Sequence, residues 1–141
     1  MKKRFTALVL SCLLLVGSVQ VFAVAASQQS IPQITIQPQW INVALIQLSM
    51  SYSGGNVNWS GLITGNSNTA SIVATYKLEQ INGNTTTIKG KWPDSTYTST
   101  FLFSSNSAAA TQGIYMLSVS AVVTNTSGVS ETVTDFLIRS L

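Results

Sequence analysis

The feature that most constrains the fold of this chain is an alternation of apolar side chains with a period of two residues. It is clearest between Gly113 and Thr124, where every second residue is apolar, namely Tyr115, Leu117, Val119, Ala121 and Val123. Successive side chains of a strand point to opposite faces of a sheet, so this spacing predicts a long strand with one face in a core. After the first 26 residues no run shows the 3.6-residue period of an amphipathic helix.

Turn-forming residues separate the alternating runs. Ser53-Gly54-Gly55-Asn56 predicts a tight hairpin, and the Asn-Gly pair within Ile81 to Asn84 predicts a type I′ turn, whose central residues both need positive φ. Pro93 and Asp94 are predicted to end a strand from Thr85 to Trp92 in a type I turn. About seven short strands result. The chain is therefore predicted to be all-β, a two-sheet antiparallel sandwich.

The alternation also assigns side chains to faces. From Ile41 to Ser53 the apolar residues stand at odd positions up to Leu45 and at even positions from Ile46, which predicts a β-bulge or a strand that crosses between sheets. Later strands are predicted from Tyr97 to Ser104 and from Val129 to Arg139. In the third strand the inner residues are predicted to be Ile72, Ala74, Tyr76 and Leu78, with Ser71, Val73, Thr75, Lys77 and Glu79 on a solvated outer face.

The first 26 residues have the organisation of a secretory signal peptide. A positive start, Met1 to Arg4, precedes a mostly apolar run to Phe22 and the small residues Ala23-Val24-Ala25-Ala26. A membrane anchor is the alternative, because about 20 apolar residues can span a bilayer; the polar end of the run favours cleavage. Residues 27–39 are predicted to be a flexible N-terminal arm and residues 40–141 the β-sandwich domain. We expect a secreted protein that is extracellular or loosely associated with the cell surface and has no membrane association after cleavage.

Cleavage would change the charge of the chain. The whole sequence has a net charge of +3, but Lys2, Lys3 and Arg4 leave with the signal peptide, and the remainder has four basic and four acidic residues. A neutral chain lacks the clustered cations that bind nucleic acid. The single cysteine, Cys12, leaves as well, so no disulfide is expected.

The residue inventory argues against enzymatic chemistry. The chain has no histidine, which excludes the usual nucleophile–base pairs, and with no mature cysteine zinc sites and thiol chemistry are also unexpected. Glu131 and Asp135 would lie about 13 Å apart on one strand, too far for a glycosidase pair. Calcium-binding and phosphate-binding loops are absent from the sequence. We predict a non-enzymatic protein without cofactor or metal.

Two sequence stretches carry a resemblance to known proteins. "GIYMLSVSAVV" resembles the penultimate strand of immunoglobulin-like and PKD-like domains. This implies that the Tyr115 hydroxyl bonds nearby backbone, that Leu117 takes the core position of an antibody cysteine, and that Tyr76 replaces the usual third-strand tryptophan. The chain from Trp40 onward is similar to small secreted proteins of Gram-positive bacteria, through "SGLITG" and "YKLEQINGN". The resemblance implies an immunoglobulin-like sandwich and secretion, and no particular activity.

Aromatic residues are the candidates for binding contacts. Trp59 and Tyr115 share a face with apolar residues and are predicted to be core. Trp40 and Trp92 are predicted to lie at strand ends and Tyr97 near a turn, so these three are the candidate exposed contacts.

Three functions compete at this stage. The first is a secreted recognition or adhesion module that binds a cell-envelope glycan or a protein. The alternative is a structural or matrix protein, a homo-oligomer that assembles through its own edge strands. From Ser27 onward 42 of 115 residues are Ser, Thr or Asn and only eight are charged, so electrostatic protection against edge pairing is weak. A secreted inhibitor, an immunity or antibacterial protein, or an unnoticed enzyme is the third possibility.

Overall fold

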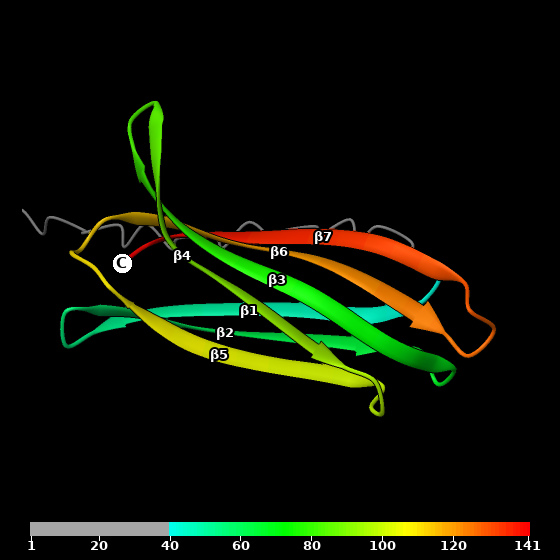
Figure 1. The fold of residues 1–141 in the computed structure, drawn as a ribbon. Helices are drawn as coiled ribbons and strands as arrows, with labels where there is room; N and C mark the ends of the chain where they lie inside the picture. Colours follow the sequence, from blue (N-terminus) through cyan, green and yellow to red (C-terminus); the bar gives the residue numbers. More distant parts are fainter. Residues whose placement is uncertain (1–39) are drawn as a thin grey trace, which may run out of the picture. The chain divides into compact units, whose positions relative to one another are not determined.

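The computed structural model describes residues 40–141, which form seven strands and no helix. The sequence predictions for residues 1–26 and 27–39 lie outside the described residues. In the described part of the chain, no helix has the length and apolarity needed to cross a membrane. The strands are β1 (Val43–Ser53), β2 (Asn56–Gly65), β3 (Thr69–Asn82), β4 (Thr85–Thr96), β5 (Phe101–Ala109), β6 (Ile114–Asn125) and β7 (Ser130–Ser140) (Figure 1).

The strands form two antiparallel sheets that lie one above the other (Figure 1). One sheet has the order β1-β2-β5 and the other the order β4-β3-β6-β7. The predicted all-β, two-sheet sandwich of about seven strands is confirmed. Because β3 and β6 occupy the centre of the larger sheet, the apolar residues on their inner faces up to Leu78 and from Tyr115 are buried.

The inner faces of both sheets supply one hydrophobic core. All five alternating apolar residues of β6 are at most 2% exposed, and Trp59 is 4% exposed, so both predictions of core residues are confirmed. The resemblance implied that Tyr115 would bond nearby backbone, and its hydroxyl does donate to the Thr111 carbonyl at 2.6 Å. Leu117 and Tyr76 are fully buried, as expected.

The phase change in the first strand is a β-bulge. The register with β2 shifts between Val43 and Leu45, so Ala44 is the extra residue and Ile46 turns inward. The bulge is one of the two alternatives that the sequence left open. Ile41 was assigned to the face of Val43, and this was wrong: it is 79% exposed because the strand begins only at Val43.

The two tightest hairpins use different turns. Gly54 and Gly55 both have positive φ, 58° and 75°, which is the type I′ pattern. In the β3–β4 hairpin only Gly83 has positive φ, 60°, and no described non-glycine residue does. The type I′ prediction was wrong there, because Asn82 pairs with Thr85 and makes Gly83 the first central residue, which corresponds to type II′.

The predicted turn at Pro93 and Asp94 does not form. β4 continues to Thr96, and Pro93 pairs with Thr75 inside the strand. Proline is tolerated there because β4 is an edge strand, so one side of its backbone needs no donor. Trp92 therefore lies within β4 and not at its end, and Tyr97 precedes β5, which begins at Phe101.

Glu79 was assigned to a solvated face and is 6% exposed, so that prediction was wrong. The β3–β4 register shifts here, with Leu78 opposite Gly90 and Glu79 opposite Ile88. Beyond this bulge the hairpin bends away from the two sheets (Figure 1). The Lys77 ammonium covers the carboxylate, with Nζ 3.0 Å from Oε2, so the acid is paired and not solvated.

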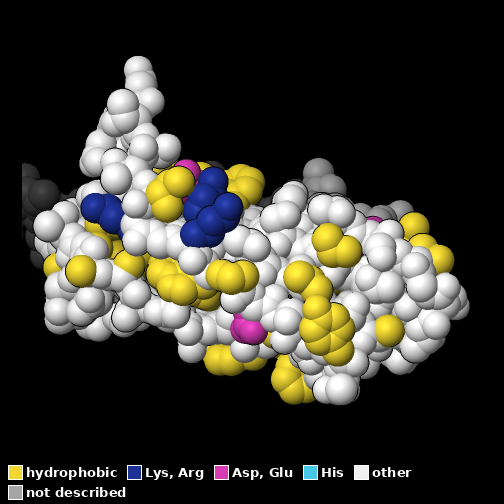
Figure 2. Space-filling view, in the orientation of Figure 1, with side chains coloured by type: hydrophobic (Ala, Val, Ile, Leu, Met, Phe, Trp, Pro, Cys, Tyr) yellow, Lys and Arg dark blue, Asp and Glu magenta, His cyan; other side chains and the backbone are white. Residues whose placement is uncertain are grey.

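Charge is divided unequally between the sheets. The eight charged residues of the described chain all lie on β3, β4 and β7, in the larger sheet, and β1, β2 and β5 carry none. Most of the surface in Figure 2 carries neither charged nor apolar side chains, and blue basic side chains gather near the base of the β3–β4 hairpin. The charged residues are Lys77, Glu79, Lys89, Lys91, Asp94, Glu131, Asp135 and Arg139.

Candidate functional site

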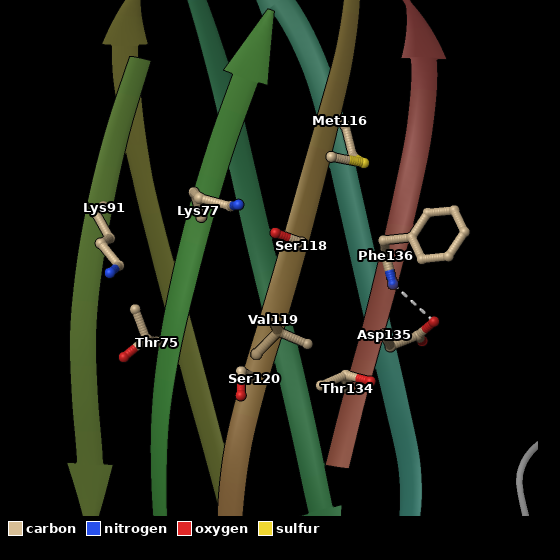
Figure 3. A pocket seen from close by; sticks show the side chains of 10 residues that line it. All are labelled: Thr75, Lys77, Lys91, Met116, Ser118, Val119, Ser120, Thr134, Asp135 and Phe136. Carbon is tan, nitrogen blue, oxygen red and sulfur yellow. Dashed lines mark hydrogen bonds between the residues drawn. The ribbon is translucent and has the colours of Figure 1, made fainter. Parts of the chain in front are cut away.

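A hollow lies on the outer face of the four-stranded sheet. We call it the lysine groove; it has a volume of about 590 Å³ and crosses all four strands (Figure 3). Its lining comprises Thr75, Lys77, Lys91, Met116, Ser118, Val119, Ser120, Thr134, Asp135 and Phe136.

Strand register brings these residues together. Lys91 on β4 lies opposite Lys77 on β3, Lys77 lies opposite Ser118 on β6, and Ser118 lies opposite Phe136 on β7. Their chain neighbours Tyr76, Leu117 and Val119 are buried in the core, so the alternation directs this row outward.

The two lysines give the groove a positive end. Like charges directly opposite each other on a sheet repel. Glu79 offsets the charge of Lys77 through the ion pair at 3.0 Å. Within residues 40–141 no acid lies within ion-pair distance of Lys91, so one ammonium at the groove has no counter-charge in the described chain.

The rest of the groove is polar but uncharged, with an aromatic side. Hydroxyl groups of Thr75, Ser118, Ser120 and Thr134 lie along β3, β6 and β7, and the Phe136 ring, on the side away from the lysines, is 62% exposed (Figure 3). The Asp135 carboxylate lies at the β7 edge and accepts a hydrogen bond from its neighbour, the Phe136 amide, at 2.8 Å. The groove therefore offers ammonium groups, hydroxyls and an exposed ring, which suits binding.

All four carboxylates of the chain have a structural partner. Glu131 accepts hydrogen bonds from the amides of Ile41 and Asn42, at 3.0 and 2.7 Å. Asp94 accepts from the Ser104 hydroxyl at 2.6 Å, while Glu79 and Asp135 are paired as described above. Among the residues that the structure describes, no three His, Cys, Asp or Glu side chains are grouped as a metal site would need.

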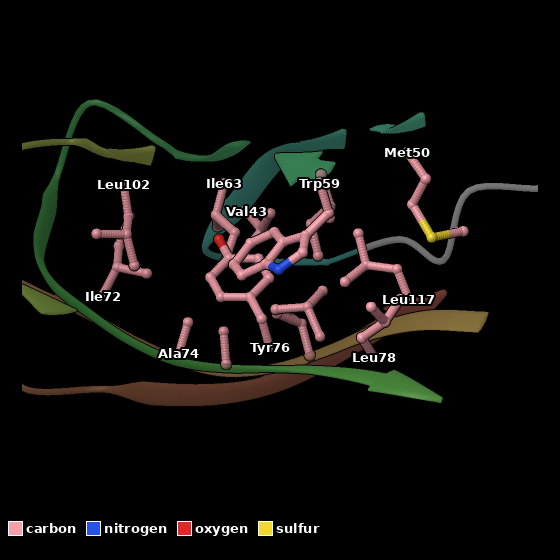
Figure 4. Packing of buried hydrophobic residues seen from close by; sticks show 14 of the residues in the cluster. Val43, Met50, Trp59, Ile63, Ile72, Ala74, Tyr76, Leu78, Leu102 and Leu117 are labelled. Carbon is pink, nitrogen blue, oxygen red and sulfur yellow. The ribbon is translucent and has the colours of Figure 1, made fainter. Parts of the chain in front are cut away.

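A second, smaller hollow of about 330 Å³ lies between the edges of β4 and β5, and we call it the seam groove. The Trp92 ring lines it, 5.0 Å from the ring of Trp59, and Trp59 stacks on Tyr76 at 4.9 Å. Figure 4 shows Trp59 and Tyr76 together at the centre of the core. Trp92 is thus the outer member of a cluster of three aromatic rings that joins both sheets, with the Trp92 ring tilted by 48° from that of Trp59.

The polar side of the seam groove surrounds the Tyr76 hydroxyl. Burial raises the pKa of the Tyr76 phenol; the nearby Ser104 hydroxyl opposes this shift and the Asp94 carboxylate adds to it. The phenol makes no hydrogen bond of good geometry with any described residue. Its polar neighbours therefore only partly compensate for its burial.

The three predicted contact residues do not form one site. Trp40 is half-buried against the core, next to Ile41 and Asn42, and Tyr97 is 69% exposed in the loop between β4 and β5. Both lie at the same end of the sandwich. The backbone of Asn42, close to Trp40, bonds Asn66, and the backbone of Thr100, close to Tyr97, bonds the adjacent Gly65. Trp92 lies away from them in the seam groove.

Sequence reasoning missed the lysine groove. Alternation does place Lys77 and Phe136 on outer faces, but Lys77 was interpreted as part of a solvated face. The relation between them arises because β6 lies between β3 and β7, and no local pattern specifies that order.

No protein-family model matches this chain, and no curated protein matches its sequence at a significant level. The interpretation of the site therefore depends on its geometry.

Proposed function

We propose that this chain is a secreted, non-enzymatic recognition module that binds an anionic glycan of the cell envelope through the lysine groove. The observation that carries the proposal is a groove with three features: the Lys91 ammonium, which has no ion-pair partner among residues 40–141, a row of hydroxyls, and an exposed ring on the opposite side. Ammonium groups attract carboxylate or phosphate, the hydroxyls suit a polyhydroxylated ligand, and a ring face packs on a sugar.

The absence of enzymatic activity is part of this proposal. It is supported by the carboxylates, each of which already holds a backbone amide, a hydroxyl or a lysine. General acid–base catalysis would need one of these groups to exchange protons with a substrate. Secretion is supported by the signal-like sequence of residues 1–26.

We also propose that the sandwich is of the immunoglobulin-like type. The strand orders β1-β2-β5 and β4-β3-β6-β7 support this assignment, as does the hydrogen bond from the Tyr115 hydroxyl to Thr111 just before β6. A tyrosine at that corner is a feature of immunoglobulin-like domains.

The binding test compares Gram-positive cell wall that retains its anionic polymers with wall from which they have been extracted by acid. We expect the protein to sediment with the first and not with the second, and to be released as salt is raised, because ions screen exposed charges. Equal retention on both walls would contradict an anionic ligand.

Matched variants locate the contact. Lys91→Gln and Phe136→Ala should each reduce retention on the unextracted wall. Lys89→Gln removes the same charge from the same strand but does not line the groove, so it should bind like the parent protein. Retention of Lys91→Gln at the parent level would rule out the lysine groove.

A further inference from the structure

Each sheet has two outer strands with one unpaired edge, β1 and β5 in the smaller sheet and β4 and β7 in the larger one. An open edge presents backbone N–H and C=O groups that another strand can pair with. Charges and prolines discourage such pairing. A side-chain oxygen that bonds an edge amide does so as well, because it occupies the donor that a new strand would need.

The hydrogen-bond phase identifies the residues that face each edge, because bonded and open residues alternate along an antiparallel strand. Leu141 exchanges two backbone hydrogen bonds with Gly113, so the odd-numbered residues of β7 bond β6. The backbone groups of its even-numbered residues therefore face the open edge. Ala110 and Thr100 at the two ends of β5 bond residues at the ends of β2, so the even-numbered residues of β5 bond β2. The backbone groups of its odd-numbered residues face the open edge.

Three of the four edges have blocked amides. Side-chain oxygens of Asp135 on β7, Asn106 on β5 and Asp94 on β4 each accept a hydrogen bond at 2.8 Å from the next backbone amide. On β5 the Phe101 amide also bonds the Ser99 hydroxyl, and on β4 Pro93 has no amide hydrogen. Charged residues add protection to β4 and β7.

The edge of β1 has none of these features. On β2 the backbone groups of odd-numbered residues point to β5, so those of even-numbered residues point to β1. The register pairs these even-numbered residues with Ser49 and the other odd-numbered residues of β1. The open backbone groups are therefore those of Ile46, Leu48, Met50 and Tyr52. β1 contains no charge and no proline, and no described side chain bonds its amides.

We propose that the edge of β1 pairs antiparallel with β1 of a second copy of this chain, about a two-fold axis at Ser49. In this register Leu48 lies opposite Met50 of the second copy and Ile46 opposite its Tyr52, so every open residue finds an open partner. The two three-stranded sheets become one continuous sheet.

Three observations favour a second copy as the partner strand. β1 has no charge to repel its own copy, and residues 40–141 carry four acidic and four basic residues, so two copies have no net repulsion. Leu48 and Tyr52 are only half-buried beside this edge, and Leu137 of the adjacent β7 is half-buried as well. Antiparallel addition would cover these apolar side chains with their own counterparts.

A disulfide scan tests the register in full-length protein carrying Cys12→Ser. Ser49→Cys should give a disulfide-linked dimer under mild oxidation, because the two Ser49 residues face each other. Ser51→Cys is the matched control: it faces Gln47 of the second copy, and the two introduced thiols would stand about 13 Å apart, beyond disulfide reach. Equal cross-linking of both variants, or of neither, would overturn the register.

Charge variants test the edge itself. Ser49→Lys places two ammonium groups directly opposite each other, so light scattering should show loss of dimer at concentrations where the parent protein is dimeric. Ser105→Lys makes the same exposed change on β5 and should leave the dimer intact. A parent protein that stays monomeric at every concentration overturns the proposal, as does equal loss in both variants. Neither residue lines the lysine groove, so glycan binding should be unaffected.

Discussion

The ring of Trp59 stacks on the ring of Tyr76, with centroids 4.9 Å apart and planes inclined by 29°. Trp59 comes from β2 and Tyr76 from β3, so this contact joins the two sheets at the centre of the core. The Tyr76 ring also packs against Gly61, where an added Cβ atom would overlap the ring. Glycine at position 61 therefore allows a ring stack of this thickness to fit between the sheets.

Replacing Gly61 by alanine should destabilise the fold. The added methyl group would force the buried Tyr76 ring out of its stack, and overpacking of this kind costs about 1–3 kcal/mol. Urea denaturation measures the loss. Ser60→Ala on the neighbouring, half-exposed position is the control and should change stability by less than about 0.5 kcal/mol. Equal midpoints for the Gly61→Ala protein and its parent would contradict the packing argument.

Tyr76→Phe should alter the dependence of stability on pH. Because burial raises the pKa of Tyr76, the unfolded chain loses the phenolic proton at about pH 10 while the folded chain keeps it. Fewer protons on the unfolded state mean that the free energy of unfolding of the parent falls as pH rises above this value. The phenylalanine variant lacks this contribution.

Denaturation of both proteins from pH 8 to pH 11 provides the measurement. The difference in unfolding free energy should shift in favour of Tyr76→Phe above about pH 10, since the two proteins differ only in this phenol. A difference that stays constant across this range would show that the folded phenol titrates normally.

Glu131→Ala should loosen the start of the domain. The carboxylate accepts hydrogen bonds from the amides of Ile41 and Asn42. Asn42 is only 2% exposed, so loss of the carboxylate leaves its amide buried without this partner. We expect destabilisation of about 1–3 kcal/mol and faster hydrogen exchange at these amides. Glu131→Gln keeps one acceptor oxygen, so its stability should lie between those of the parent and the alanine variant. Unchanged exchange rates at these amides in the alanine variant would contradict this role of Glu131.

Tyr115→Phe should cost about 1 kcal/mol, the typical value of a hydrogen bond, because it leaves the Thr111 carbonyl without the phenolic donor. Thermal or urea unfolding measures this loss. Tyr97→Phe removes the same atom from a ring that is 69% exposed and should have almost no effect. Similar losses in both variants would mean that the corner bond does not stabilise the fold.

The strands were predictable where a local pattern specified them. The alternation in β6 identified all of its buried residues, and the paired glycines identified the β1–β2 hairpin. The prediction failed at Pro93, because proline ends a strand only where its amide is needed, and the open edge of β4 does not need it. Glu79 was misassigned because the bulge and the covering ammonium of Lys77 depend on a neighbouring strand.

The candidate contacts show the same limit. Trp92 was recognised as an aromatic residue outside the innermost core, but its ring contact with Trp59 joins residues 33 positions apart on different sheets. The lysine groove needs Lys77 and Phe136 to be separated by a single strand, and nothing near either residue indicates that arrangement.

By itself, the sequence determined the class of secondary structure, most of the inward-facing side chains and the positions of the tightest hairpins. These follow from alternation and glycine conformation, which depend on residues close together along the chain. Only the tertiary structure decided which strands became edges, which acids were paired and where the grooves lay. Those properties arise from strand order and register, and they are set by packing between segments that are distant in the sequence.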